Sequence, residues 1–152
     1  MTTDLDEQVI DFILRVTGAM GLTLDAALEE TPDHLRVNLT GAGAEVLLRR
    51  KAEALDALQV IVNTAFGREA RGDRHYVVDA LEYRKGKDVE LQQMAKVLME
   101  KVHTTGAPQE VGPLNPYARR LVHLTVAEDA TLSSISIGDA FLKIVVIDKK
   151  RQ

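Results

Sequence analysis

The hydrophobic residues of this chain recur with two periods, one of three to four residues and one of two. In the first 20 residues the apolar positions have the spacing of a helix with one buried face, and Gly18 and Gly21 mark its end. Residues 22–29 and 35–39 alternate or are rich in strand-forming residues around "EETPDH", which predicts a hairpin. The chain therefore opens with a helix and two strands.

The next 40 residues predict two helices and a third strand. Gly41 and Gly43 break the chain before "AEVLLRR", and "AEALDALQVIVNTAFG" carries an apolar helical stripe that ends at Gly67. "HYVVDAL" at residues 75–81 is typical of a strand. The order is helix, strand, strand, helix, helix, strand.

The second half predicts a long helix, a short extended piece, a shorter helix and a final hairpin. From Lys87 to Thr105 apolar residues recur at three and four positions, and "APQEVGPL" follows as an extended piece. Asn115 is a preferred N-cap and Pro116 a preferred first helical residue, so a helix should run from there to about Ala127. "TLSSISIG" and "FLKIVVID" form the hairpin, which turns near Gly138 and Asp139. The stretch "YRKGK" at residues 83–87 is the expected junction between two units, 1–82 and 83–152.

Composition indicates a globular protein outside the membrane. The chain has 152 residues, of which 45% are hydrophobic, enough to bury a core. No apolar run approaches the roughly 18 residues of a membrane span, and the N-terminus "MTTDLDEQ" is acidic where a signal peptide is basic. We therefore expect a cytoplasmic protein that is not embedded in a membrane.

Metal, cofactor and cysteine chemistry are not expected. The chain has no cysteine, which excludes disulfides, a cysteine nucleophile and thiolate zinc sites. The four histidines lie 41, 28 and 20 residues apart, so none forms a short metal-ligand pair. A nuclease with His123 as general base is a weak alternative, because no pair of carboxylates at metal-binding spacing accompanies the histidine. No catalytic residue is assigned.

The charge is unevenly distributed along the chain. A net charge of −4 argues weakly against nucleic acid as a partner. Residues 1–48, however, hold two basic and nine acidic residues, a net −7, so the remainder carries +3. A basic surface is therefore available after residue 48.

Arg119 and His123 form the most specific candidate site. On the predicted helix Tyr117, Leu121 and Leu124, with Val126 as a further candidate, would supply the buried stripe. Arg119 and His123 are neighbours on another face because residues four apart stack. A guanidinium can hold a phosphate with two parallel hydrogen bonds, and a mostly neutral imidazole can stack or donate one hydrogen bond. Such a pair also arises often by chance, so spacing alone does not establish a function.

The context of the pair resembles a known domain. "NPYARRLVH" at residues 115–123, followed by "SISIGDAFLKIVVI" at 134–147, is similar to the R-x-x-x-H (R-3-H) domain, in particular its form in the SpoIIIJ-associated (Jag) family of bacterial proteins. That family has a pattern close to NPYERRxVH, then a serine-rich strand, a glycine and a final strand. The chain departs from it at Ala118, where an acid is usual.

The resemblance extends upstream, to about residue 5, and ends near residue 148. "LLRRKAEALDALQVIVN" at residues 47–63 resembles the family's "LIGRRGQTLDALQYLVN", which belongs to a type II KH domain. The resemblance thus implies an α+β fold, a KH-like α-β-β-α-α-β unit followed by a small α/β R-3-H domain. The small N-terminal domain that often precedes the KH unit in this family is expected to be missing.

One departure affects the KH-like unit. A KH domain grips the backbone of about four nucleotides through a G-x-x-G loop, where glycine allows phosphates to approach backbone N–H groups. Here the four positions are Arg49, Arg50, Lys51 and Ala52. Three cations can still attract phosphates, with a steep salt dependence; alternatively, the unit now acts as a scaffold. We favour reduced or altered binding at this loop.

The resemblance implies a non-catalytic protein that binds single-stranded RNA with low sequence specificity, and it leaves open whether single-stranded DNA competes. Arg119 would hold a phosphate, His123 would stack or hydrogen-bond beside it, and Arg120 and Lys143 would add positive charge. The alternative is an adaptor that acts through protein contacts. Jag-like proteins are associated with a membrane insertase and a small single-KH protein, and the acidic first third of the chain suits such a contact.

Overall fold

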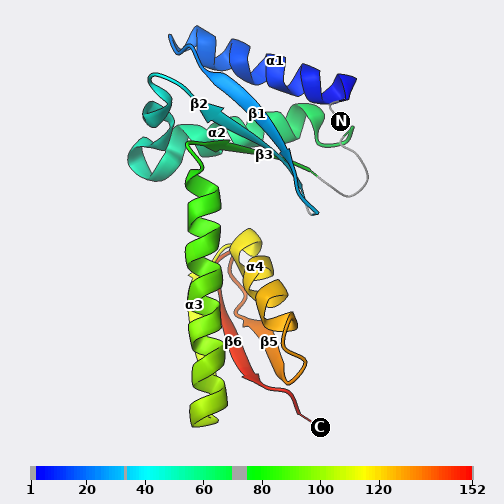
Figure 1. The fold of residues 1–152 in the computed structure, drawn as a ribbon, viewed down its shortest axis with the longest axis vertical. Coiled ribbons are helices and arrows are strands. Elements are labelled where there is room, and N and C mark those ends of the chain that lie inside the picture. The colour runs from blue at the N-terminus through cyan, green and yellow to red at the C-terminus, as the bar shows by residue number, and fades with distance from the viewer. Residues whose placement is uncertain (1–2, 33, 70–74, 152) are drawn as a thin grey trace. The chain divides into compact units, whose positions relative to one another are not determined.

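The chain divides into two compact units, an N-terminal one that ends at Lys85 and a C-terminal one that begins at Gly86. The computed structural model describes residues 3–32, 34–69 and 75–151. Its elements confirm the expected α+β class (Figure 1). In chain order they are α1 (Asp4–Ala19), β1 (Asp25–Glu30), β2 (His34–Thr40), the 3-10 helix η1 (Ala44–Leu48), α2 (Arg49–Phe66), β3 (His75–Ala80), α3 (Tyr83–Thr105), β4 (Gln109–Leu114), α4 (Pro116–Ala127), β5 (Leu132–Ile137) and β6 (Lys143–Lys149).

The N-terminal unit is a three-stranded sheet with its helices on one face. The strand order is β1-β2-β3, with β2 antiparallel to β1 and parallel to β3. Alternate residues of β2, Leu35, Val37 and Leu39, are fully buried and share a core with Ile13 of α1 and Leu55 of α2. This order of elements is compatible with the type II KH-like unit that the sequence resembles.

A left-handed turn joins the two helical pieces of this unit. The first piece is the 3-10 helix η1, and Arg50, Lys51 and Ala52 then have φ angles of 53°, 58° and 63° before α2 becomes regular. This backbone costs a residue with a Cβ about 1–2 kcal/mol. Burial on both sides holds the turn, since Leu47 and Ala52 are each only 1% exposed.

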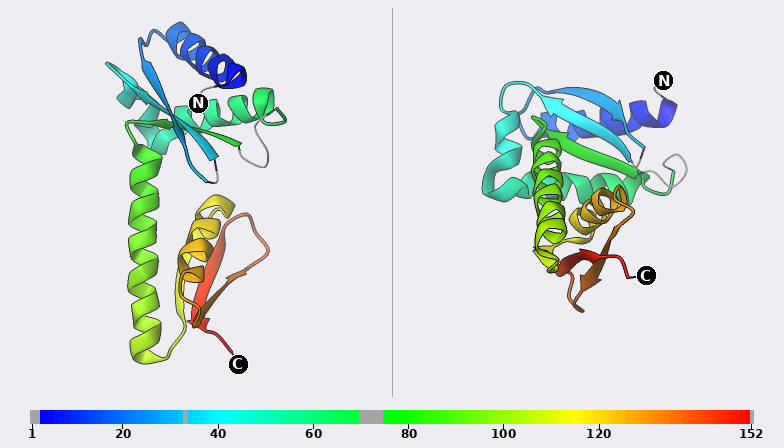
Figure 2. Two further views of the ribbon diagram at one scale, coloured as in Figure 1. Left: turned by 45° about the vertical axis from the view of Figure 1, so that its right-hand side comes forward. Right: turned by 60° about the horizontal axis from the view of Figure 1, so that its bottom comes forward.

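The C-terminal unit also has a three-stranded sheet, in the order β4-β6-β5, with both pairs antiparallel. Its core combines residues of all five elements, including Val102 of α3, Val122 and Val126 of α4, and Val145 and Ile147 of β6. Figure 2 shows α4 running along the sheet. A hydrogen bond from Tyr117 to Asp88 (2.8 Å) also joins α4 to α3. A second one, between His103 and Asp129 (2.7 Å), joins α3 to the chain two residues past the end of α4.

Helix α4 begins and ends where the sequence predicted, but it buries a different face. The Asn115 side chain accepts the Ala118 N–H at 2.8 Å, as an N-cap does. The predicted buried stripe is wrong at Tyr117 and Leu124, which are 40% and 45% exposed, and right at Val126, which is buried together with Val122 and Thr125. The helix carries apolar residues on several faces, so its periodicity did not identify the one that meets the sheet.

Two further comparisons concern α3. It begins at Tyr83, four residues before the predicted start at Lys87, and ends at Thr105 as predicted, where Gly106 takes a positive φ of 74°. Among the described residues no helix is long and apolar enough to cross a membrane.

Candidate functional site

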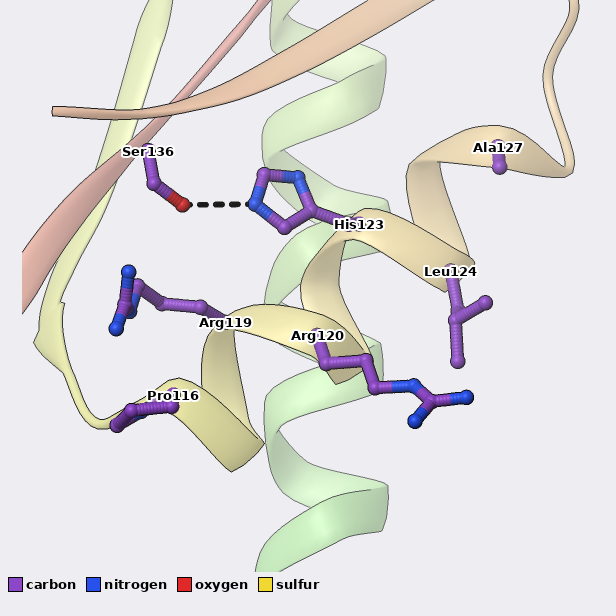
Figure 3. Close-up of a pocket in the computed structure, with 7 residues that line it drawn as sticks. All are labelled: Pro116, Arg119, Arg120, His123, Leu124, Ala127 and Ser136. Carbon is purple, nitrogen blue, oxygen red and sulfur yellow. Dashed lines mark hydrogen bonds between the residues drawn. The ribbon is translucent and has the colours of Figure 1, made fainter. Parts of the chain in front are cut away.

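An open pocket of about 450 Å³ lies along the outer side of α4. Its lining combines apolar and cationic residues of the helix with one serine of β5: Pro116, Arg119, Arg120, His123, Leu124, Ala127 and Ser136. Figure 3 shows Arg119 and His123 on the same side of α4, toward the strands, whereas Arg120 projects in another direction. The structure therefore brings the predicted pair together at one pocket.

Arg119 is half-buried and keeps unused hydrogen-bond donors. One Nη2–H donates to the Phe141 carbonyl oxygen across a long 3.4 Å contact, and Nε is buried with no partner in the described part of the chain. A guanidinium has five N–H donors and cannot lose its charge in a protein. The pocket therefore contains a fixed positive charge whose hydrogen-bonding capacity is largely unfilled.

His123 does not offer free ring nitrogens, contrary to the sequence-based expectation. Its Nδ1 lies 2.6 Å from the Ser134 hydroxyl and its Nε2 lies 2.8 Å from the Ser136 hydroxyl. The physical reason is the period of two in β5, which places both serines on the face that meets α4. A serine hydroxyl can donate or accept, so the pair satisfies both ring nitrogens.

The surroundings of His123 favour its neutral form. Burial lowers the pKa of its imidazole below the ordinary value of 6.5, and the positive charge of Arg119 lowers it further. Arg119 is thus the charged member of the pair, and His123 joins α4 to β5.

Lys143 stands on the same side of the sheet as α4. Lys143, Val145 and Ile147 are every second residue of β6, so they share one face of the sheet. Val145 and Ile147 are buried there beneath the helices, and Lys143 pairs with Leu114 at the end of β4 that leads into α4. Its ammonium group makes no hydrogen bond or ion pair within residues 3–32, 34–69 and 75–151. Lys143 is therefore free to add positive charge on the side of the sheet where Arg119 lies.

Arg49, Arg50 and Lys51 lie in the N-terminal unit, at the left-handed turn. All three are exposed, and none has a side-chain hydrogen bond or ion pair among the described residues. Arg49 and Ala52 stand where the family's loop has glycine, and the backbone at Arg50, Lys51 and Ala52 has the positive φ that glycine favours. The predicted cationic loop is therefore exposed, and it belongs to the N-terminal unit.

The carboxylate of Asp129, two residues past the end of α4, is already engaged. Asp129 lines a smaller pocket of about 240 Å³ that also contains His123. Hydrogen bonds from Thr131 and His103 lower the pKa of Asp129 to about 2. Across the described residues no group of three histidine or acidic side chains is close enough to hold a metal ion.

The sequence reasoning missed two kinds of site residue. Ser134 and Ser136 hold the His123 ring, and the alternation "SISI" was a usable indication that they share one face of a strand. Phe141 contacts Arg119 through its carbonyl oxygen, and nothing in the local pattern of "GDAFLK" indicates that contact.

Comparison with known proteins identifies the C-terminal unit and places the whole chain. Residues 89–149 match the family model of the R-3-H domain. A protein of Clostridium symbiosum named RNA-binding protein KhpB is 29% identical over 150 residues, which cover 97% of this chain and 68% of that protein.

Two further relatives with the same name support this placement. The one from Bacillus subtilis strain 168 is 25% identical over 142 residues, covering 92% of this chain and 68% of that protein. The one from Lactiplantibacillus plantarum is 22% identical over 141 residues, covering 92% of this chain and 44% of that protein. Residues 89–149 are thus an R-3-H domain, and the chain is a homologue of the KhpB proteins, which confirms its resemblance to the Jag family.

Proposed function

We propose that the protein binds single-stranded RNA at the α4 pocket, with low sequence specificity and without catalysis. The observation that carries the proposal is the half-buried Arg119 guanidinium, which faces an open pocket with most of its donors unfilled. The R-3-H domain and the names of the relatives support RNA as the ligand. The cytoplasmic location that the sequence predicts is part of the proposal.

Arg119 holds a backbone phosphate in this mechanism. Charge-assisted hydrogen bonds from a guanidinium to a phosphate are short and strong, and the planar donor group can make two at once. Lys143 on the same side of the sheet adds a second positive charge, and exposed Arg120 adds a third at the other edge of the pocket. Apolar Pro116 and Leu124 line the rest of the pocket and suit the uncharged parts of a nucleotide.

His123 acts by positioning rather than by taking the nucleotide with its nitrogens. Its two hydrogen bonds fix β5 against α4 and so hold the strand that leads into the loop of Phe141, where Arg119 makes its long contact. Contacts to phosphate and to the faces of bases carry little sequence information, so we expect low specificity and competition by single-stranded DNA.

The cationic turn of the N-terminal unit is a secondary site in this proposal. Arg49, Arg50 and Lys51 attract phosphates at a distance, but their side chains prevent the close approach that a glycine loop allows. We therefore assign less of the affinity to this turn than to Arg119.

A non-catalytic role is consistent with the surroundings of His123. Both ring nitrogens contact serine hydroxyls, and no carboxylate in the described part of the chain is hydrogen-bonded to the ring to orient it as a base. Labelled RNA incubated with the protein and magnesium should stay intact. Cleavage that disappears in a His123→Gln variant would contradict this part of the proposal.

An adaptor function is the second candidate, and the charge distribution favours it. The N-terminal unit has ten basic and fifteen acidic residues, a net −5, which suits contact with a basic protein. The family resemblance suggests a single-KH protein and a membrane insertase as such partners. An adaptor without an RNA site would form no RNA complex even at low salt.

The test is fluorescence anisotropy with a short labelled RNA on the wild type and on Arg119→Gln. We expect Arg119→Gln to weaken binding by roughly 10- to 150-fold, the range of hydrogen bonds to charged groups. The matched control is Arg15→Gln, which removes the same charge from an exposed ion pair on α1 and should bind like the wild type. Equal binding by Arg119→Gln and the wild type would overturn the site.

A further inference from the structure

Phe141 is an exposed aromatic side chain beside the phosphate site. Of the three phenylalanines of the chain, Phe12 and Phe66 pack edge to face with ring centroids 5.5 Å apart. Phe141, in the loop between β5 and β6, is 71% exposed. Burying such a large apolar side chain is favourable, so Phe141 would gain from a partner that covers it.

The backbone of Phe141 contacts the guanidinium of Arg119. Its carbonyl oxygen accepts the Nη2–H of Arg119 at 3.4 Å, so the loop stands at the guanidinium that would hold a phosphate. The loop is also held through β5, because Ser134 and Ser136 bond to His123. The aromatic side chain and the cation therefore belong to one assembled surface.

The chemistry of this loop suits a base rather than a phosphate. A phenyl ring has no polar atom and offers only a flat π face, on which any nucleobase can stack. Exposed Asp139, two residues earlier, repels a phosphate but not an uncharged base. Next to a guanidinium that holds the backbone, the neighbouring base is the flat group within reach.

We propose that Phe141 is a stacking platform for the base next to the phosphate held by Arg119. This inference rests on the proposed function and assigns the site a second contact of different chemistry. It implies that the ligand must present an unpaired base, because a base inside a duplex is already stacked.

The first test uses Phe141→Trp, since the chain contains no other tryptophan. Titration with a short single-stranded oligonucleotide should quench the fluorescence of Trp at this position, whereas an abasic oligomer of the same length should bind more weakly without quenching. Equal responses to the two oligomers would overturn the platform.

The second test compares Phe141→Ala with Leu142→Ala, a matched control at the next residue, which is 51% exposed. Phe141→Ala should weaken binding of the oligonucleotide by roughly 5- to 150-fold, the range that stacking on an aromatic side chain spans. Leu142→Ala should stay within about twofold of the wild type. An equal loss in both variants would show a general apolar surface and contradict stacking.

The two proposals fail in different ways. If Arg119→Gln loses binding and Phe141→Ala does not, the platform is wrong and the RNA site stands. If the wild type binds no oligonucleotide at low salt, the proposed function falls and the platform falls with it.

Discussion

Arg119 and His123 have different roles, although they lie one helical turn apart on the same side of α4. They stand at the edge of the buried face, beside Val122 and Val126, and not opposite it. This position gives Arg119 a partly desolvated pocket, in which its charge is less screened than at the surface. It also brings the His123 ring within reach of the serines of β5.

Replacing the two serines that contact His123 should have the same effect on stability and RNA affinity as replacing His123 itself. We expect Ser134→Ala combined with Ser136→Ala to lower the free energy of unfolding by about 1–3 kcal/mol, because each lost hydrogen bond contributes about 0.5–1.5 kcal/mol. RNA affinity should fall by roughly 2- to 10-fold in this variant and in His123→Phe, since both release β5 from α4. Urea denaturation and anisotropy measure the two effects.

Ser133→Ala is the control for this comparison, because Ser133 lies on the opposite face of β5 and should change neither quantity. A His123→Phe variant that binds RNA as tightly as the wild type would show that the ring acts by direct stacking, against the positioning role.

The sequence predicted that Arg119 and His123 lie together, but not which residues they contact. Asn115 and Pro116 locate the start of α4 because their capping chemistry is local. The alternation "SISI" shows which residues share a face but not which face a helix covers. Hydrophobicity alone would turn the isoleucines inward, yet Ile135 and Ile137 are 58% and 52% exposed and the serines face His123.

At the scale of the elements, the left-handed turn at the start of α2 departs most from what local preferences predict. "LLRRKAEAL" is composed of good helix formers, yet Arg50, Lys51 and Ala52 take left-handed backbone angles. The resemblance to a KH loop located the turn, whereas its backbone depends on the packing of Leu47 and Ala52 on either side. Tertiary packing has overridden propensity here.

Glycine at Lys51 should stabilise the protein. Lys51 is exposed with φ 58° and ψ 41°, so its replacement removes about 1–2 kcal/mol of backbone strain at no loss of packing. The greater freedom of the unfolded chain offsets about 0.4–1 kcal/mol of this gain. We expect Lys51→Gly to raise the free energy of unfolding by about 0.5–1 kcal/mol in urea denaturation.

The control for Lys51→Gly is Lys96→Gly, at an exposed position inside α3, which should lower the free energy of unfolding by about 1 kcal/mol. If Lys51→Gly destabilised the protein as much as Lys96→Gly, the turn would not be left-handed in solution.

At the scale of the whole molecule, hydrophobic periodicity was sufficient for the order of the elements, and the family resemblance supplied the α+β class. It could not identify which side of each sheet its helices cover, since that choice depends on contacts between residues far apart in the chain. Net charge is equally unable to locate the RNA site. The C-terminal unit has nine basic and eight acidic residues, a net +1, so the RNA site depends on the placement of Arg119 and Lys143 and not on a strongly basic composition.

The salt dependence of RNA binding separates the two candidate surfaces of the molecule. Each phosphate that a cation neutralises on a single strand contributes about −0.7 to the slope of log K against log salt. With Arg119 and Arg120 lining the α4 pocket and Lys143 on the same side of the sheet, up to three cations can contribute, and we expect a wild-type slope of about −2. Arg119→Gln should make this slope shallower by about 0.7, whereas combined Arg49→Gln, Arg50→Gln and Lys51→Gln should change it by less than that. If the slope of the triple variant were shallower by about 2, three times the contribution of one cation, the left-handed turn at the start of α2 would be the main phosphate site.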